Sequence, residues 1–276
     1  MIIENISLLI TTHPPHYKYL YNLINKCINN NITIDTFLVF SNEEDYESFE
    51  MKEYITPIIV KDKLNENGIV SFKKLYGLTQ MVNFKNEFII CIDSEIDIIV
   101  ENFTNEIINE KINNIFNNLK TYTGEVTSSE IKSIIDSSSK LFINDYEKLR
   151  ELTNNFSLYC WWSDLPVYRK SDLNNFFELI NFDENKYKIH GLYFEYIIYQ
   201  YYLILNCNFS IENVTPYTNI RWSLEEIYTR DLNVLNKLSD EGYGFSWISK
   251  KSFDMNPDYY MSKNTCFIYH LDRAGY

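Results

Sequence analysis

Residues 86–100 read NEFIICIDSEIDIIV. The wholly apolar run Phe88–Ile92 is rich in β-branched side chains, which is typical of a buried central strand. It ends abruptly in Asp93, Glu95 and Asp97, three carboxylates within five residues. Carboxylates are costly to bury without a cation, and at the carboxyl edge of an α/β sheet they commonly serve a ligand or a metal. The stretch therefore predicts a buried strand that ends at a site for a hard divalent cation.

Strand and helix patterns alternate over the first 100 residues of the chain. The expected strands are 6–10, 34–40, 56–60 and 88–92, and the expected helices are 17–27, 46–54 and 71–81. This alternation indicates an α/β fold with a mostly parallel, Rossmann-like central sheet flanked by helices. The loops 11–15, 41–45 and 93–97 should gather at one edge of that sheet, where open α/β sheets bind their ligands.

The pattern becomes helical and polar after residue 100. A helix is expected over 102–120, and Thr127 and Glu130 form a plausible capping box for a helix that runs to Phe142. Residues 101–155 therefore predict an inserted helical lobe.

Further elements are expected beyond this lobe: strands 155–162 and 265–270, and helices 171–180 and 191–205. No linker rich in Gly, Pro or Ser divides the chain. We expect a single domain, 1–276, in which the helical lobe (101–155) follows an α/β half (1–100) and precedes a mixed half (156–276).

Composition narrows the class of protein. Hydrophobic residues make up 45% of the chain and its net charge is −13, which favours a sizeable core and argues against binding nucleic acid or an anionic membrane through charge. The five cysteines are scattered without a CxxC, a pattern of reducing compartments. There is no basic signal sequence and no apolar run long enough to form a transmembrane segment, so the expected location is the cytoplasm.

The order of these features resembles the GT-A glycosyltransferases. Ile89–Glu95, IICIDSE, is similar to their signature of an apolar strand followed by DxD, although Glu95 stands where the family has Asp. The segment Lys73–Leu78 and the pieces Phe194–Tyr196 and Arg221–Glu225 resemble parts of small bacterial and viral polysaccharide transferases. The resemblance follows the order of elements over most of the chain, but the matching letters form only short patches.

The resemblance implies a transferase that moves a sugar, of the hexosyl type, from a UDP- or GDP-sugar to a glycan or polysaccharide acceptor. It makes residues 1–100 the nucleotide-sugar-binding half and residues 156–276 the acceptor half. It implies Mn²⁺ or Mg²⁺ bound by Asp93 and Glu95, with Asp97 in reserve. It also makes His270 a candidate third metal ligand, because some GT-A enzymes supply a late histidine. The alternatives without a metal are that the acidic motif is a solvated turn and that His270 has a structural role.

Other residues are candidates for binding the nucleotide and its diphosphate. Thr11 and Thr12 lie where the family holds the base, and Asn42 follows the next strand, although ordinary turn and cap roles suit them nearly as well. Lys73 and Lys74 form a basic pair in an acidic chain and could meet the diphosphate, or could be solvated helix lysines.

An inverting transferase needs a carboxylate to deprotonate the acceptor hydroxyl. The candidates are Asp164, Glu195, and Glu225 or Glu226. Glu195 is the most suggestive, because a carboxylate amid Tyr193, Phe194 and Tyr196 must be paired or face a cleft.

Two rival functions remain open. A Mg²⁺-dependent nucleotidyl- or phosphotransferase would also use carboxylates, but the loop after the first strand, TTHPP, lacks the glycines of a phosphate loop. The other rival is a non-catalytic binding protein of the same fold.

Overall fold

The computed structural model describes residues 1–60, 69–162, 164–182, 193–218 and 231–273. Its central five-stranded sheet has the order β3-β2-β1-β4-β8. The members are β1 (Ile2–Thr11), β2 (Thr33–Phe40), β3 (Thr56–Ile59), β4 (Phe88–Asp93) and β8 (Val167–Arg169). The first four strands run parallel, and β8 pairs antiparallel with β4. The predicted α/β fold with a mostly parallel, Rossmann-like sheet is confirmed.

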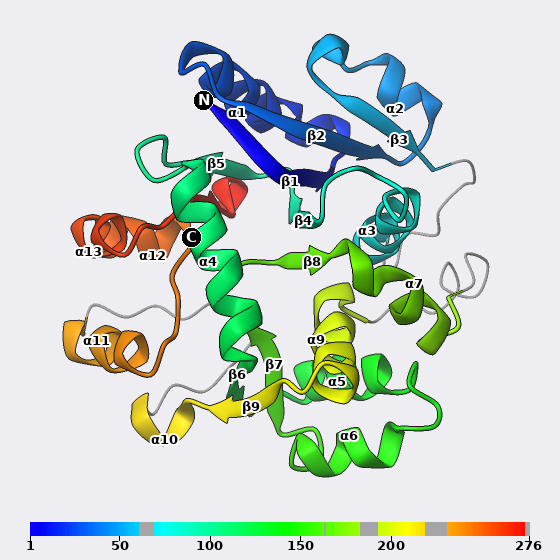
Figure 1. The fold of residues 1–276 in the computed structure, drawn as a ribbon, viewed down its shortest axis with the longest axis vertical. Helices are drawn as coiled ribbons and strands as arrows, with labels where there is room; N and C mark the ends of the chain where they lie inside the picture. The colour runs from blue at the N-terminus through cyan, green and yellow to red at the C-terminus, as the bar shows by residue number, and fades with distance from the viewer. Residues whose placement is uncertain (61–68, 163, 183–192, 219–230, 274–276) are drawn as a thin grey trace.

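Two smaller sheets complete the strands. One has the order β10-β11-β5 and the other β7-β6-β9. Their members are β5 (Ile96–Ile98), β6 (Lys120–Glu125), β7 (Leu158–Trp162), β9 (Ser210–Asn213), β10 (Trp247–Ser249) and β11 (Phe267–Tyr269). In Figure 1 the five-stranded sheet occupies the upper half of the molecule, and β6, β7 and β9 lie below it.

Helices flank the sheets. They are α1 (Tyr17–Asn29), α2 (Glu43–Glu47), α3 (Ile69–Gln80), α4 (Asn105–Asn118), α5 (Ser129–Ser139), α6 (Tyr146–Leu152), α7 (Lys170–Leu179), α9 (Glu195–Asn206), α10 (Thr215–Thr218), α11 (Leu232–Asp240), α12 (Lys250–Met255) and α13 (Pro257–Ser262). Short 3₁₀ turns are η1 (Pro14–His16), η2 (Lys52–Tyr54) and η3 (Leu271–Arg273). Within the described residues, no helix is long and apolar enough to cross a membrane.

Helix α3 packs directly on β1 and β2 because of a glycine. A Cβ atom at Gly77 would lie 2.8 Å from the Val39 side chain and 3.0 Å from that of Leu9. The missing side chain therefore allows the close approach of helix and sheet. This approach fixes the two lysines of α3 relative to the carboxyl ends of the strands.

Several local elements differ from those predicted from the sequence. The expected helix 46–54 is instead the short helix α2 followed by η2, since Asn42 caps the chain earlier. The acidic loop 93–97 contains strand β5, which pairs with β11 near the C-terminus. Strands β8, β9 and β10 were not predicted, since runs of three or four residues are too short to show a period.

The segment 101–155 contains helices α4 and α5, as predicted, and also helix α6, which was not predicted. It also contains β6, which pairs with β7 and β9. Because both partners come from later in the chain, this segment is tied into the second half by backbone hydrogen bonds.

Candidate active site

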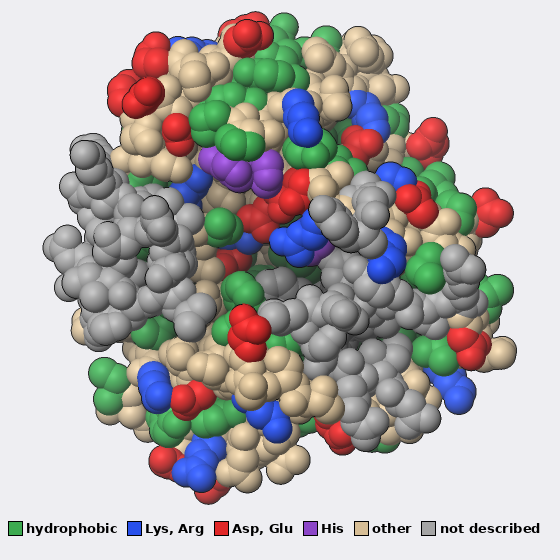
Figure 2. Space-filling model, turned by 180° about the vertical axis from the view of Figure 1, so that it is seen from behind, with side chains coloured by type: hydrophobic (Ala, Val, Ile, Leu, Met, Phe, Trp, Pro, Cys, Tyr) green, Lys and Arg blue, Asp and Glu red, His purple; other side chains and the backbone are tan. Residues whose placement is uncertain are grey.

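The site begins where parallel strands end. Thr11 is the last residue of β1 and Asp93 is the last of β4, and the two are directly paired in register. The Thr11 hydroxyl donates a hydrogen bond of 3.1 Å to Asp93 Oδ1. The expected meeting of strand ends at one edge is therefore seen in the structure. Figure 2 shows histidine, acidic and basic side chains gathered around a hollow on the face opposite to that of Figure 1.

Lys74, on α3, joins two carboxylates. Its Nζ lies 3.2 Å from Asp93 Oδ1 and 2.9 Å from Glu195 Oε1, at the start of α9. Burial lowers the pKa of Lys74, but the charges of Asp93 and Glu195 outweigh it and raise the pKa above its usual value. Lys74 is therefore a permanent cation, and it is only 7% exposed. The solvated-lysine alternative is wrong.

The Asp93 side chain is 40% exposed and is therefore open to solvent. Burial raises its pKa, but the charge of Lys74, hydrogen bonds from Lys74 and Thr11, and the charge of His270 hold the pKa below its ordinary value. Asp93 is therefore ionised at neutral pH.

Glu95 contacts a histidine that the sequence reasoning missed. His16 Nδ1 lies 3.1 Å from Glu95 Oε2 and 3.1 Å from Ser94 Oγ. Burial and the charge of Asp93 raise the pKa of Glu95, against the opposing effect of His16. The only sequence signal for His16 is that it directly follows the strand-end loop 11–15.

The C-terminal segment closes on the same place. The Leu271 amide donates to the Glu95 carbonyl at 3.1 Å. His270 has φ 57°, in the left-handed region, which turns the chain just after β11. The antiparallel pairing of β11 with β5 thus carries His270 to the acidic motif.

Lys73 lies on the other side of the site. Its Nζ donates to the Thr12 carbonyl and, at 3.1 Å, to Ser41 Oγ at the end of β2. Burial lowers its pKa to about 8, although Asp45 and Asp93 act in the opposite direction. The Thr12 hydroxyl is buried without a hydrogen-bond partner among the described residues. Thr12 therefore carries one buried polar group whose partner the described residues do not supply, on the residue whose carbonyl accepts from Lys73.

Three candidates have other contacts. Asn42 uses its side-chain oxygen to cap α2, accepting from the Asp45 amide at 2.8 Å. Asp97 lies on β5, on the face opposite to the buried side chains of Ile96 and Ile98, where it forms an ion pair with Lys26 at 2.5 Å. Glu195 is 3% exposed and paired with Lys74, so it is not a helix-surface residue.

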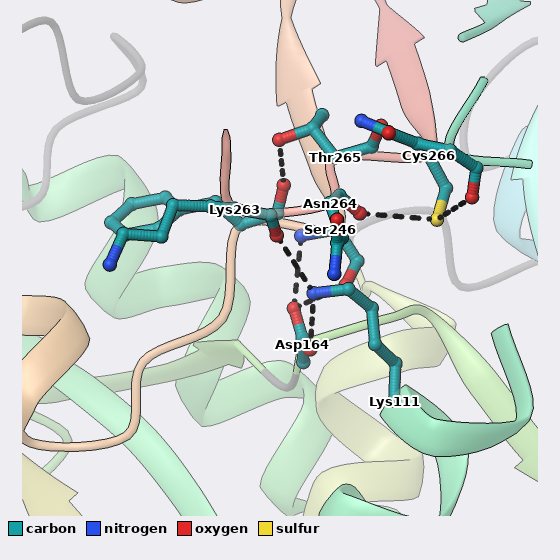
Figure 3. Close-up of polar contacts among 9 residues, drawn as sticks. Lys111, Asp164, Ser246, Lys263, Asn264, Thr265 and Cys266 are labelled. Atoms are coloured by element: carbon teal, nitrogen blue, oxygen red, sulfur yellow. Dashed lines mark hydrogen bonds and ion pairs between the residues drawn. The ribbon is translucent and has the colours of Figure 1, made fainter. Parts of the chain in front are cut away.

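Asp164 belongs to a different place in the fold. Its carboxylate accepts from the Ser246 amide at 2.9 Å and from the Ser246 hydroxyl at 2.6 Å, and it lies 3.4 Å from Lys111 Nζ (Figure 3). The structure therefore does not bring Asp164 into contact with the Asp93 cluster. Glu225 and Glu226 lie outside the described residues.

A divalent cation would need oxygen atoms from outside the protein. Among the residues that the structure describes, no group of three or more His, Cys, Asp or Glu side chains is arranged to hold a metal. Mg²⁺ in particular is usually held by one or two carboxylates, with water and substrate phosphates completing its shell. Asp93 suits that arrangement because it is ionised and its side chain is 40% exposed, and Glu95 follows it two residues later.

The chain has little detectable similarity to known proteins. No protein-family model matches the chain. No curated protein is significantly similar to it. One similar solved structure is S. aureus TarS 1-349 in complex with UDP-GlcNAc, at 12% identity, 68% coverage of this chain, 53% coverage of that chain and a TM-score of 0.31. At that TM-score the likeness carries no argument.

Proposed function

We propose that the protein is a metal-dependent glycosyltransferase that moves a sugar, of the hexosyl type, from a UDP- or GDP-sugar to a glycan or polysaccharide acceptor. The observation that carries the proposal is the Asp93–Lys74–Glu195 chain at the carboxyl edge of a parallel sheet, with Lys73 beside it. Such an edge is where α/β proteins bind nucleotides. The site combines fixed cations for a diphosphate with an open carboxylate for a metal.

Each side chain has a distinct role in this proposal. Asp93 and Glu95 would hold Mn²⁺ or Mg²⁺, with His270 next to them, and Asp97 is left out because Lys26 engages it. The bound cation would neutralise charge on the leaving diphosphate. Lys73 and the Thr12 hydroxyl would bind the nucleotide or its phosphates.

Glu195 is better suited to positioning than to proton transfer. Its buried carboxylate lies 2.9 Å from Lys74, which holds the ammonium against Asp93. A general base must reach the acceptor hydroxyl, and a carboxylate engaged in this way does not. We therefore assign Glu195 the role of orienting Lys74.

One observation favours a second candidate. The ammonium of Lys74 already sits between two carboxylates, in the place of a cation. A protein that binds a nucleotide sugar through Lys74, without a metal, would use the same contacts. The nucleotidyl- or phosphotransferase and the non-catalytic binding protein remain further alternatives.

The first test is a thermal-shift screen against UDP, GDP, CMP, ADP and their sugars, with and without Mn²⁺. Ligands that bind the native state raise the melting temperature by mass action. Under the main proposal, one nucleotide family should raise it only with Mn²⁺. A shift that is equal without Mn²⁺ favours the Lys74 alternative.

Two variants test the metal ligands. Asp93→Asn and Glu95→Gln should each weaken Mn²⁺-dependent donor binding by about tenfold or more, since each removes a negative charge that would bind the cation. Asp97→Asn is the matched control, because Asp97 is equally acidic but paired with Lys26. Unchanged donor affinity in both Asp93→Asn and Glu95→Gln would contradict the proposal.

A further inference from the structure

A cavity of about 300 Å³, separate from the Asp93 cluster, lies between α4, the start of β6 and the loop after α11. Its polar lining includes Lys111, Asn114, Asn118, Lys120, Tyr122 and Lys263. None of its lining residues belongs to the Asp93 cluster. Its volume is at the lower end for small-molecule sites, which run from roughly 300 to 1,000 Å³.

The cavity is basic in a protein whose net charge is −13. Three lysines line it, with Asp164 as their one acidic counterpart in the lining. Lys111 Nζ takes up that charge, lying 3.4 Å from Asp164 Oδ2 and donating to the Lys263 carbonyl at 3.2 Å (Figure 3). Within the described chain, Lys120 and Lys263 have no carboxylate partner, and the Lys263 ammonium lies 5.5 Å from the centre of the Tyr259 ring.

Two hydrogen bonds and a close backbone contact hold Asp164, which lines the cavity, in place. Asp164 is fixed by the amide and hydroxyl of Ser246, which is fully buried. Gly244 passes so close that a Cβ atom there would lie 1.8 Å from the Asp164 carboxylate. The one acidic group of the lining is thus held in place, and it cannot swing out to neutralise Lys120 or Lys263.

Neutral donors complete the lining. Asn114 and Asn118 recur at helical spacing from Lys111, so α4 presents all three on one side. Burial and the carboxylates of Glu212, Asp164 and Glu241 raise the pKa of Tyr122 to about 12. Its hydroxyl therefore keeps its proton at neutral pH and donates it to the Glu241 carbonyl at 3.2 Å, which leaves the hydroxyl oxygen as an acceptor for a ligand.

We propose that this cavity binds the anionic group of a small sugar-like molecule, a phosphate monoester or a carboxylate. The ammonium groups of Lys120 and Lys263, which have no carboxylate partner among the described residues, attract the anion, and the asparagine amides and the tyrosine hydroxyl oxygen suit sugar hydroxyls. The cavity has room for a ligand of about one monosaccharide. This inference does not depend on the proposed transferase activity, because it uses none of the same residues.

Isothermal titration with three probes tests it: glucose 6-phosphate, glucuronate and neutral glucose. At least one anionic sugar should bind, and glucose should bind far more weakly. Lys120→Gln and Lys263→Gln should each weaken anion binding by about tenfold, the effect of losing one charge-assisted hydrogen bond. Binding of only one anion would support the proposal and tell phosphate from carboxylate.

Lys148→Gln is the matched control, because it makes the same change of charge at an exposed site on α6. An equal loss in Lys148→Gln, equal binding of glucose, or no binding at millimolar concentrations would overturn the proposal. Binding that survives both cavity variants but is lost in Lys74→Gln would also overturn it, since the anion would then lie at the Asp93 cluster. Circular dichroism of each variant confirms that the fold is retained.

Discussion

At the residue scale, two adjacent lysines have opposite electrostatics. Lys74 lies between two carboxylates, which raise its pKa, whereas burial lowers the pKa of Lys73 to about 8. The difference arises because neighbours on a helix point about 100° apart, so they reach different partners. Lys73 reaches a carbonyl and a hydroxyl, which stabilise its charge less than carboxylates do.

Lys73 should make stability depend on pH. Its pKa falls from 10.5 to about 8 on folding, so between those values the unfolded chain binds more protons and stability rises with pH. Burying the charged Lys73 ammonium destabilises the native state fully below pH 8, and this destabilisation is absent above pH 10.5. Relative to Lys73→Met, the wild-type free energy of unfolding should therefore gain about 2 kcal/mol between pH 8 and pH 10.

Urea denaturation of both proteins at several pH values measures this difference. Lys148→Met provides the baseline, since Lys148 is exposed. A wild-type advantage that stays constant or falls over this range would show that Lys73 is not destabilised by burial.

At the element scale, helix α5 shows how a cap is chosen. The sequence predicts that Thr127 and Glu130 begin the helix, but the N-cap is Ser128, whose hydroxyl accepts from the Ile131 amide at 3.4 Å. Just before it, the Val126 amide bonds to the Ser157 carbonyl at 2.8 Å. Both residue types can cap a helix, and this long-range bond keeps the chain extended for one residue more.

Alanine substitutions distinguish the two caps. Ser128→Ala should lower the free energy of unfolding by about 1 kcal/mol, because it removes the capping acceptor. Thr127→Ala should cost less than about 0.5 kcal/mol, as at most surface positions. The two variants can be compared by urea denaturation, and the reverse order of effects would place the cap at Thr127.

At the scale of the whole molecule, the site is assembled from distant parts of the chain. Asp93 comes from β4, Lys74 from α3, and Glu195 from α9, and His270 follows β11. The pairing of β5 with β11 and of β4 with β8 draws these parts together. A ligand at this edge therefore contacts both halves of the chain at once.

Hydrogen exchange tests that assembly. With Mn²⁺ and the nucleotide found in the thermal screen, the Thr12 and Leu271 amides should exchange more slowly, because their bonds to Val39 and Glu95 lie at the site. The amides of α6 should not change, since its helix is remote from the strand ends (Figure 1). Protection around Thr12 without any at Leu271 would contradict the placement of the C-terminal segment.

Much of the first half could be predicted from the sequence. The parallel strands, α1, α3 and the acidic end of β4 follow from periodicity and from abrupt changes in polarity. The same reasoning could not find His16 or the roles of Asp97 and Asp164, since nothing in local sequence records which partner a polar side chain meets. It also missed the strands β5, β8 and β10, whose three residues show no period.

The sequence by itself determined that a buried strand ends in carboxylates and that a basic pair precedes it, because both are matters of local pattern. Only the tertiary structure decided that Lys74 pairs with both Asp93 and Glu195, that Asp97 turns to Lys26, and that Asp164 lines a separate cavity. The physical reason is that the pKa and the role of a charged side chain depend on burial and on the nearest opposite charge. Both are set by residues far away in the chain.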